Sequence, residues 1–440
     1  MAEPWLTVEC VRQAAAAAAD CIQVHWREQR LPGMRVQSVF LFLRPALALM
    51  LAVAVCAAPA RGYSVLTHEE IVDIVWLDHL RPMILHRFPG LTEDQLRQAH
   101  AHAYGGAVIQ DLGYYPFGSK DFSDLVHYVR SGDFVAEMLR QSADANEYAF
   151  ALGALAHYCA DIEGHPSVNI AAGIEYPKLR ERFGPVVTYA DKPSAHLQTE
   201  FGFDVTQIAK QRYTSQQYHD FIGFAVAESL LERSFSAVYG LPLRDVLTRE
   251  DLAIGTYRWA VSRAIPNMTT AALATHREQL AKEQPNFNKQ KFLYQISRAE
   301  YERDWGSHYR QPGLGTRMLA AILKVVPRVG PFKGAAFRHP TPQTEDLYFK
   351  SVNATVERYK QLLAQVEQKT FKLKNYDLDT GKASARGEYA LTDRAYQRLA
   401  RVLAQGQWAL SPELKQNLSG FVGAQAETSA RAAGGAAQPR

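Results

Sequence analysis

Residues 149–165 read AFALGALAHYCADIEGH, and this stretch decides how the chain folds. Its first eight residues are apolar or glycine, so a helix built from them is apolar on every side and belongs in the interior. The same helix then carries His157, Asp161 and His165 at intervals of four, which places the three side chains on one face. Buried imidazole and carboxylate groups cost several kcal/mol unless they find partners. The stretch therefore predicts a buried helix with one face that must pair internally or bind a ligand.

The apolar residues around this stretch, from 63 to about 285, recur mostly every three or four positions. This spacing predicts helices throughout and almost no strands. The expected helices are 66–87, 92–110, 121–140, 144–164, 194–210, 215–238, 250–264 and 268–284. Residues typical of turns separate them, at 88–90, 113–116, Pro166 and 183–185. We therefore expect an all-α fold, a multi-helix bundle with its functional site between the helices.

The chain has 440 residues, which is longer than one compact domain usually is. We expect one helical domain over 63–285 and a second, C-terminal helical domain over 286–410, with clear periodicity in 344–369 and 390–405. Residues 411–440 are expected to form a disordered tail, because the composition from residue 423 onward is rich in Ala, Gly and Gln.

Residues 34–62 have the three-part layout of a secretory signal peptide. Arginines precede an apolar run at 46–58, and small residues follow it, which permits cleavage after Ala60 or after Gly62. The apolar run is short for a membrane span, although an uncleaved membrane anchor is the alternative. We therefore expect an exported protein, in the periplasm or outside the cell, with membrane association as an open alternative.

Residues 1–33 precede this signal peptide and include a run of alanines at 14–19. Such a prefix is unusual upstream of a secretory signal. It is interpreted as a segment outside the folded protein, or as a consequence of a true start at Met34.

Charge and cysteine content exclude some classes of function and of metal site. The chain has 49 Lys and Arg against 45 Asp and Glu, so it lacks the strongly basic balance of nucleic-acid-binding proteins, and no specific nucleic-acid partner is expected. Three of the four cysteines, Cys10, Cys21 and Cys56, precede or lie within the removable segment. Only Cys159 remains, so no internal disulfide or thiolate metal cluster is expected. A metal site in this chain must use histidines and carboxylates.

Further histidines and acids follow the same pattern. His196 and Glu200 lie four apart at the start of an expected helix, Asp111 ends one helix, and His127 lies inside the next. His68 stands near the expected mature N-terminus. One such pair is more often a structural hydrogen bond than a metal site. Several in a chain without cysteine ligands are typical of zinc bound by imidazole and carboxylate, so we predict a multinuclear site.

The order of these histidines and acids along the chain resembles that of the zinc-dependent phospholipase C family. The superfamily of that family includes single-strand-specific nucleases that use three zinc ions. Three stretches carry the resemblance: GAVIQDLGYYPF at 106–117, SDLVHYVRSGDF at 123–134 and YAFALGALAHYCADIEGHPSVN at 148–169. The resemblance covers about 63–220, and it makes 63–285 a phospholipase C-like domain with a C-terminal helical extension.

The resemblance also implies the ligands of two to three zinc ions. Asp111, His127, His157 and Asp161 would hold the first, and His165, His196 and Glu200 the second. The third would be held by His68, the far oxygen of Asp161, and the amino nitrogen and carbonyl oxygen of the N-terminal residue. That residue is commonly Trp in the family and would be Tyr63 here. Asp161 and His165 are two residues closer together than in the characterised branches.

The implied activity is hydrolysis of a phosphodiester by zinc-activated water, and the expected substrate is a phospholipid, cleaved on its diacylglycerol side. Asp111 would orient or deprotonate that water as well as bind zinc. Two alternatives stay open. One is a nuclease or nucleotidase with the same trinuclear site, and the other is a catalytically silent, zinc-stabilised module that binds surfaces.

Two groups of residues near the expected ligands are better explained by packing or surface exposure than by a role in binding. Tyr114, Tyr115 and Phe117 follow Asp111 and would either wall a headgroup pocket or pack a loop on the helix ends, and packing is favoured. His100 and His102 lie two apart on a helix and share no face, so they are expected to be surface residues rather than ligands.

The segment 305–344 contains six basic residues and no acidic one. This composition suits peripheral contact with an anionic membrane. The favoured alternative is a core helix with basic flanks.

Overall fold

The structure is a computed structural model, described here for residues 65–115, 117–209, 224–259, 338–406, 408 and 410–422. All of these lie within one compact unit, Ala54–Arg440. They are helical except for loops and one antiparallel hairpin of β1 (Tyr376–Asp377) and β2 (Lys382–Ala383), in which Tyr376 pairs with Ala383. The predicted all-α class is confirmed.

The helices follow one another along the chain in two series. The first comprises α3 (Val65–Val75), the π-helical turn η1 (Trp76–Leu80), α4 (Arg81–Arg87), α5 (Glu93–Val108), the 3-10 helix η2 (Ile109–Tyr114), α6 (Lys120–Tyr128), α7 (Ser131–Gln141), α8 (Ala145–Glu175), α9 (Pro177–Phe183) and α10 (Pro193–Ala209). The second comprises α12 (Glu228–Tyr239), α13 (Leu243–Val246), α14 (Glu250–Trp259), α18 (Pro342–Glu367), α19 (Ala390–Gln405) and α20 (Pro412–Val422).

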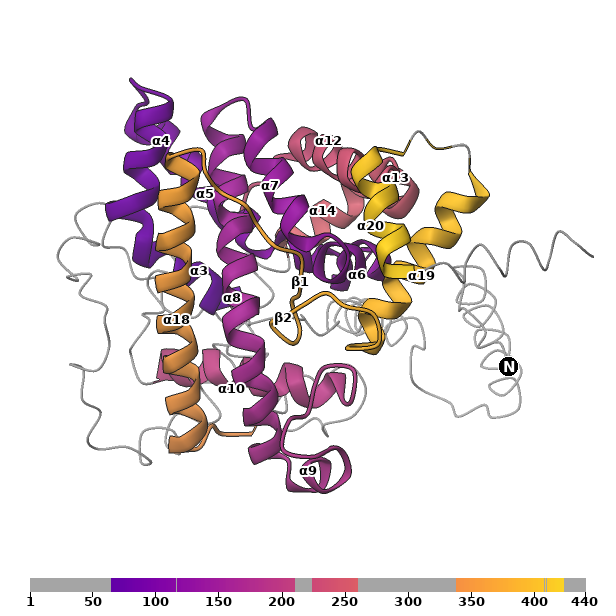
Figure 1. The fold of residues 1–440 in the computed structure, drawn as a ribbon. Helices are drawn as coiled ribbons and strands as arrows, with labels where there is room; N and C mark the ends of the chain where they lie inside the picture. The colour runs from indigo at the N-terminus through magenta and orange to yellow at the C-terminus, as the bar shows by residue number, and fades with distance from the viewer. Residues whose placement is uncertain are drawn as a thin grey trace, which may run out of the picture. The chain divides into compact units, whose positions relative to one another are not determined.

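Helix α8, 31 residues long, runs through the described core and carries the apolar stretch that the sequence singled out. The Asp144 side chain caps its first turn by accepting a hydrogen bond from the Glu147 N–H. On one side α8 packs against α5 with almost no space between the backbones, because a Cβ on Gly153 would overlap the carbonyl oxygen of Ala103. On another side α18 runs along α8, where the Tyr359 hydroxyl donates to the Leu152 carbonyl over 2.8 Å (Figure 1).

The break expected at Pro166 is wrong, because α8 continues through this proline to Glu175. Proline has no N–H to donate to the carbonyl of Ile162, one turn earlier. That carbonyl lies directly against Gly381 of the hairpin, which has no side chain to clash with it. Burial of Val168 and Ala171 in the next turns holds the helix together beyond the proline.

The single helix expected over 121–140 is also wrong, because α6 ends at Tyr128 and α7 begins at Ser131. Arg130 between them has a left-handed backbone conformation, with φ of 53°. Its guanidinium donates to the Val238 carbonyl over 2.7 Å, and this long-range bond stabilises the turn.

The described C-terminal helices share the core of the rest of the chain. Tyr348 and Tyr359 of α18, Leu399 of α19 and Leu414 of α20 belong to the same buried cluster as the residues of α8. The described part of 286–410 therefore packs into the same core as the helices before it. Residues 412–422 of the expected tail form α20.

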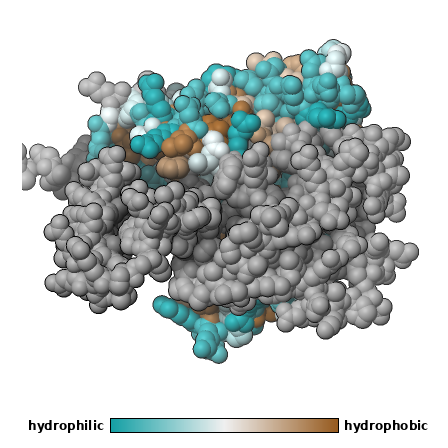
Figure 2. Space-filling model, turned by 180° about the vertical axis from the view of Figure 1, so that it is seen from behind, coloured by the Kyte–Doolittle hydropathy of each residue, from teal (hydrophilic) through white to brown (hydrophobic). Residues whose placement is uncertain are grey.

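Several expectations fall outside the described residues. They concern the prefix 1–33, the signal peptide 34–62, Tyr63, the helix 268–284 and the basic segment up to residue 337. Helices 215–238 and 250–264 are described only in part, as α12 and α14. No helix in the described ranges is both long and apolar enough to span a bilayer. On the face drawn in Figure 2 the described surface is mostly hydrophilic, with apolar residues scattered in it.

Candidate metal centre

Eight of the nine predicted ligands converge on the middle of α8. Helix α8 provides three of them, and α3, η2, α6 and α10 provide the other five. Every one of the eight side chains is buried, with no more than 2% of its residue surface exposed: His68, Asp111, His127, His157, Asp161, His165, His196 and Glu200. The ninth, Tyr63, lies outside the described residues.

The first group joins η2, α6 and α8. His127 Nε2 lies 3.3 Å from Asp111 Oδ1 and 3.4 Å from His157 Nε2. His157 Nε2 lies in turn 3.0 Å from Asp161 Oδ2. The donor atoms of Asp111, His127 and His157 all lie within 4.8 Å of one another, which is compact enough for one metal ion.

The second group joins α8 and α10. His196 Nε2 lies 2.9 Å and His165 Nε2 lies 3.4 Å from the same oxygen, Oε1 of Glu200. His165 Nε2 is also 3.6 Å from Asp161 Oδ1, so the second group reaches the central aspartate. The close spacing of Asp161 and His165 is compatible with this geometry, because residues four apart lie on one face of α8.

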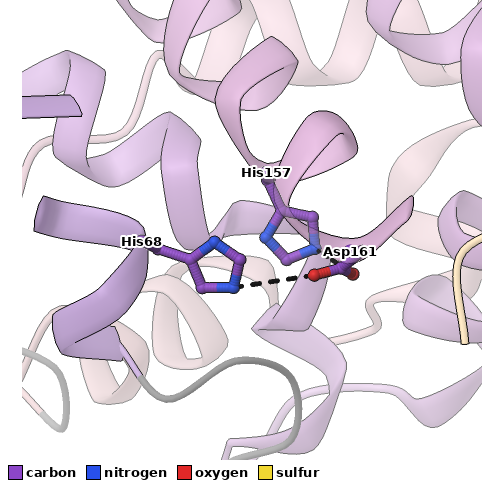
Figure 3. A group of neighbouring side chains, drawn as sticks. All are labelled: His68, His157 and Asp161. Carbon is purple, nitrogen blue, oxygen red and sulfur yellow. Dashed lines mark ion pairs between the residues drawn. The ribbon is translucent and has the colours of Figure 1, made fainter. Parts of the chain in front are cut away.

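The third group lies where α3 meets α8, as Figure 3 shows. His68 Nε2 points toward Asp161 Oδ1 across 3.7 Å, and the His68 ring stacks on the His157 ring with centroids 4.5 Å apart. Asp161 thus faces all three groups with its two oxygens. A carboxylate in that position is suited to bridge metal ions.

The orientation of the imidazoles is set by hydrogen bonds at Nδ1. His127 Nδ1 donates to the Ser123 carbonyl over 2.8 Å, and His157 Nδ1 donates to the Ala107 carbonyl over 3.0 Å. A carbonyl oxygen can only accept, so the proton sits on Nδ1 and a neutral ring presents its lone pair at Nε2. This tautomer is the one that metal-binding histidines adopt when an outer partner holds the other nitrogen.

The second group is oriented in the same way. His165 Nδ1 donates to the Leu378 carbonyl over 2.8 Å. His196 Nδ1 donates to Asn169 Oδ1 over 2.9 Å, and Asn169 Nδ2 donates to the Asp379 carbonyl, which fixes which end of the amide accepts. All four rings therefore aim Nε2 at carboxylate oxygens.

Lone pairs that face one another need a cation between them. His157 Nε2 and Asp161 Oδ2, and likewise His196 Nε2 and Glu200 Oε1, are acceptors placed about 3 Å apart. Among the described residues, no N–H or O–H group donates a hydrogen bond to either oxygen of Asp161 or Glu200. Nitrogen and oxygen donors without thiolate suit zinc. The residues present therefore fit the metal that the sequence implied.

The pKa values show the same demand for positive charge. Burial lowers the pKa of His127, but Asp111 and Asp161 outweigh burial and raise this pKa well above its ordinary value. Burial likewise acts against His157, whose pKa is nevertheless raised by Asp161. The two carboxylates thus favour a cation at the Nε2 atoms of both rings, whether a proton or a metal ion.

In the second group the acid has the displaced pKa. Burial raises the pKa of Glu200 to about 8, and burial lowers the pKa of His196 to about 4. Without a metal, the carboxyl therefore holds a proton at neutral pH and the imidazole holds none, so both groups are uncharged. A divalent cation that displaces the proton would satisfy both groups.

His100 is not at the surface, contrary to expectation. It is 1% exposed, its Nε2 lies 2.9 Å from Asp73 Oδ1, and its ring stacks on Trp76 with centroids 3.7 Å apart. Because the two histidines point to different sides of α5, His102 remains partly exposed, and its Nδ1 donates to the Gln98 carbonyl. Neither histidine belongs to the three groups.

The aromatic residues after Asp111 diverge. The Tyr114 ring lies 5.9 Å from the His127 ring, whereas Tyr115 is buried against Tyr257 and Phe117 is 49% exposed. Of the three, Tyr114 has its ring close to the ring of a candidate ligand, His127.

Sequence reasoning missed the outer partners Asn169, Leu378 and Asp379. The only signal near the last two is Asp-Leu-Asp-Thr-Gly at 377–381, which is typical of a turn. It says nothing about where in the fold the turn packs.

Comparison with known proteins gives one match. Residues 67–248 match the family model described as zinc dependent phospholipase C. No curated protein and no solved structure matches the chain. The matched region includes all eight described ligand candidates and ends before α18.

Proposed function

We propose that the protein hydrolyses a phosphodiester bond of a phospholipid, because residues 67–248 match the zinc-dependent phospholipase C family. One observation carries the proposal beyond the family. The Nε2 atoms of four histidines and the oxygens of three acids face one another in a buried centre, with every Nδ1 of those four rings tied to an outer acceptor.

The zinc ions would be held by the three groups already described. Asp111, His127 and His157 with Asp161 would hold one, and His165, His196 and Glu200 a second. His68 and Asp161 would contribute to a third, for which the amino-terminal nitrogen of Tyr63 is the proposed further ligand.

When bound, zinc supplies a water of lowered pKa and positive charge for the phosphodiester anion. The acids and the imidazole rings of the centre then contribute in two ways. Asp161, Glu200 and Asp111 keep the centre from excessive positive charge while leaving it net positive, which favours an anionic substrate. The rings hold their lone pairs in place, so no reorganisation is needed during the reaction.

Asp111 is the proposed general base. Burial raises its pKa above the ordinary value, although the nearby His127 acts in the opposite direction. A carboxylate with a raised pKa accepts a proton more readily from water. Its Oδ1 accepts no hydrogen bond from the described residues, which leaves that atom available to a water or a metal.

The test is metal analysis of the full chain after export, followed by assay on a panel of phosphodiesters with and without a chelator. We expect two to three zinc ions per chain, and chelator-sensitive release of diacylglycerol from phospholipid. Turnover of single-stranded nucleic acid or nucleotides alone would replace the phospholipase by the nuclease alternative. Bound zinc with turnover of no phosphodiester would support the catalytically silent module.

Two histidine variants test whether the loss of activity is specific to a zinc ligand. His127→Ala should abolish turnover while helicity by circular dichroism is kept, because one ring is removed from a preformed helical core. His102→Ala should leave turnover nearly unchanged, since His102 lies outside the three groups. Equal losses in both variants would contradict the assignment of His127.

A further inference from the structure

The loop of the β-hairpin, residues 377–381, lies against the metal centre although it is distant in sequence from every ligand. It connects β1 to β2 and falls outside the region that matches the family. We refer to it as the 377–381 loop. Its contacts reach three of the candidate ligands.

Two of these contacts orient the second group. The Leu378 carbonyl accepts the hydrogen bond of His165 Nδ1 over 2.8 Å. The Asp379 carbonyl accepts from Asn169 Nδ2 over 2.8 Å, and Asn169 Oδ1 accepts from His196 Nδ1 over 2.9 Å. Both imidazoles of the second group thus depend on adjacent carbonyls of one loop.

A third contact reaches the first group. The Leu378 N–H donates to the main-chain carbonyl of His127 over 3.2 Å. The loop therefore connects α6, which carries His127, to α8, which carries His165.

The Asp379 side chain anchors this loop. Its Oδ2 accepts hydrogen bonds from the Tyr128 hydroxyl over 2.8 Å and from the Tyr389 hydroxyl over 2.7 Å. Tyr128 follows His127 directly in α6, so the anchor and the ligand belong to the same helical turn. Asp379 is 5% exposed, and two hydrogen bonds to a buried carboxylate hold its main chain in one place.

The rest of the loop is rigid for two reasons. Asp377 Oδ1 accepts from the N–H groups of Asp379 and Thr380 over 3.0 and 3.2 Å. Gly381 has φ of 66° and packs on the Ile162 carbonyl, where a Cβ would overlap that oxygen. Neither the conformation nor the space admits a side chain at this position.

We propose that the 377–381 loop is a positioning element of the metal centre, with Asp379 as its anchor and Asn169 as its link to His196. It fixes the tautomer and the direction of His165 and His196, and so sets the zinc affinity of the second group. The inference rests on the zinc centre of the proposed function, but not on the reaction or the substrate. It also gives the C-terminal segment a role at the site.

Zinc affinity depends on this loop because an imidazole ring that is not held in one orientation binds metal more weakly. Without an acceptor at Nδ1, a neutral imidazole exchanges tautomers, and the tautomer protonated at Nε2 cannot bind a metal through Nε2. Loss of an outer partner typically lowers metal affinity about 10- to 100-fold.

The experiment measures zinc affinity of the full chain by competition with a chromogenic chelator. Asp379→Ala removes the anchor, and Asn169→Leu removes the link at similar volume. We expect each to weaken one zinc ion about 10- to 100-fold while the remaining zinc stays bound. Asp393→Asn is the matched control, because Asp393 accepts hydrogen bonds from Gly387 in the same C-terminal segment and contacts no ligand. It should leave all zinc affinities unchanged.

Two further measurements separate positioning from folding. Circular dichroism and thermal unfolding of the chelator-treated proteins should change little in Tyr389→Phe, which removes only one of the two anchoring hydroxyls, while its weakest zinc affinity still falls. In cobalt-substituted protein, the visible absorption of one metal should shift in Asn169→Leu and not in Asp393→Asn.

The outcomes distinguish this inference from the proposed function. Unchanged zinc affinities in Asp379→Ala, Asn169→Leu and Tyr389→Phe would overturn the positioning role. Equal loss of every zinc ion in parallel with loss of helicity would also overturn it, since the loop would then be merely structural. Unaltered protein that binds no zinc would instead refute the proposed function. Bound zinc without phosphodiester turnover would refute the reaction and leave the positioning role intact.

Discussion

At the scale of single residues, the centre depends on Asp161. Its two oxygens lie 3.0 Å from His157 Nε2, 3.7 Å from His68 Nε2 and 3.6 Å from His165 Nε2. Burial alone would raise the pKa of Asp161, yet His157 and His165 outweigh burial and hold this pKa well below its ordinary range. The carboxylate therefore remains charged and available to all three groups.

Asp161→Ala should remove more zinc than any other single substitution, because this side chain serves more than one metal position. His157→Ala should remove less. Glu163→Ala is the control, since Glu163 lies two residues away on α8 and pairs with Arg358 instead. Elemental analysis of purified protein measures the result, and full zinc content in Asp161→Ala would contradict the bridging position.

The pH dependence of metal-free protein follows from the raised pKa values. Between about pH 6.5 and 8, folded protein retains protons on Glu200, whose pKa is raised to about 8, and on His127, whose pKa is well above its ordinary value. The unfolded chain has lost these protons, because unperturbed Glu and His titrate at about 4.3 and 6.5. Since the folded state binds more protons in this window, its stability falls as the pH rises.

We therefore expect the unfolding midpoint of chelator-treated protein to be lower at pH 8 than at pH 6.5. Zinc should reverse this trend, because zinc displaces the same protons and binds more tightly as the pH rises. Thermal unfolding at both pH values, with and without zinc, measures the difference. A stabilisation by zinc that shrinks toward pH 8 would refute the assignment of these groups as ligands.

At the scale of elements, the direct contact of α5 and α8 places the first group. Gly106 of α5 approaches the Phe150 carbonyl and Gly153 of α8 approaches the Ala103 carbonyl, so the two backbones touch. The Ala107 carbonyl, one residue after Gly106, then accepts the hydrogen bond of His157 Nδ1. The packing of α5 on α8 therefore also places the acceptor that orients the His157 ring.

Gly153→Ala should destabilise the protein by about 1–3 kcal/mol, because the added methyl group overlaps a carbonyl and forces the helices apart. Gly255→Ala is the matched control, since Gly255 lies in α14 with nothing within 4 Å of an added Cβ. That control should be neutral or stabilising by up to about 1 kcal/mol, as alanine favours helix over glycine. Urea unfolding of both variants provides the test, and similar midpoints would contradict a tight α5–α8 contact.

At the scale of the whole molecule, the described C-terminal elements pack in the same core as α8 and contact the candidate centre. Helix α18 covers α8, and the 377–381 loop contacts His127, His165 and Asn169. The amino-terminal end has a proposed role too. His68 lies close to the start of the described chain, with its Nε2 3.7 Å from Asp161 Oδ1.

We predict that cleavage after Gly62 frees the amino group of Tyr63 as a zinc ligand. Ala60 and Gly62 satisfy the small-residue rule at the third and first positions before the cut. A free α-amine, with an ordinary pKa of about 7.7–8.0, loses its proton readily to a divalent cation, whereas an internal amide does not. Tyr63 stands five residues before His68, close enough to share one metal.

N-terminal sequencing of exported protein identifies the cut. Zinc content is then compared between chains that begin at Tyr63 and at Arg61. The second chain is the product of cleavage after Ala60. We expect about one zinc ion fewer in the chain that begins at Arg61. Equal zinc content in the two chains would exclude the amine as a ligand.

The sequence by itself determined the parts of the protein that depend on local spacing. The all-α class follows from the recurrence of apolar residues every three or four positions. The shared faces of His157, Asp161 and His165, and of His196 and Glu200, follow from the four-residue spacing within one helix. Those regularities are properties of the helix and need no partner.

Only the tertiary structure decided the features that depend on contacts between distant segments. Helix α8 continues through Pro166, and the carbonyl of Ile162 one turn earlier packs against the hairpin glycine, Gly381. The turn at Arg130 is stabilised by the carbonyl of Val238, and His100 is buried by Trp76 and Asp73. Leu378 and Asp379 reach the centre because α6, α8 and the hairpin pack together. Local periodicity carries no information about such packing, since the energy that selects it comes from contacts between residues far apart in the chain.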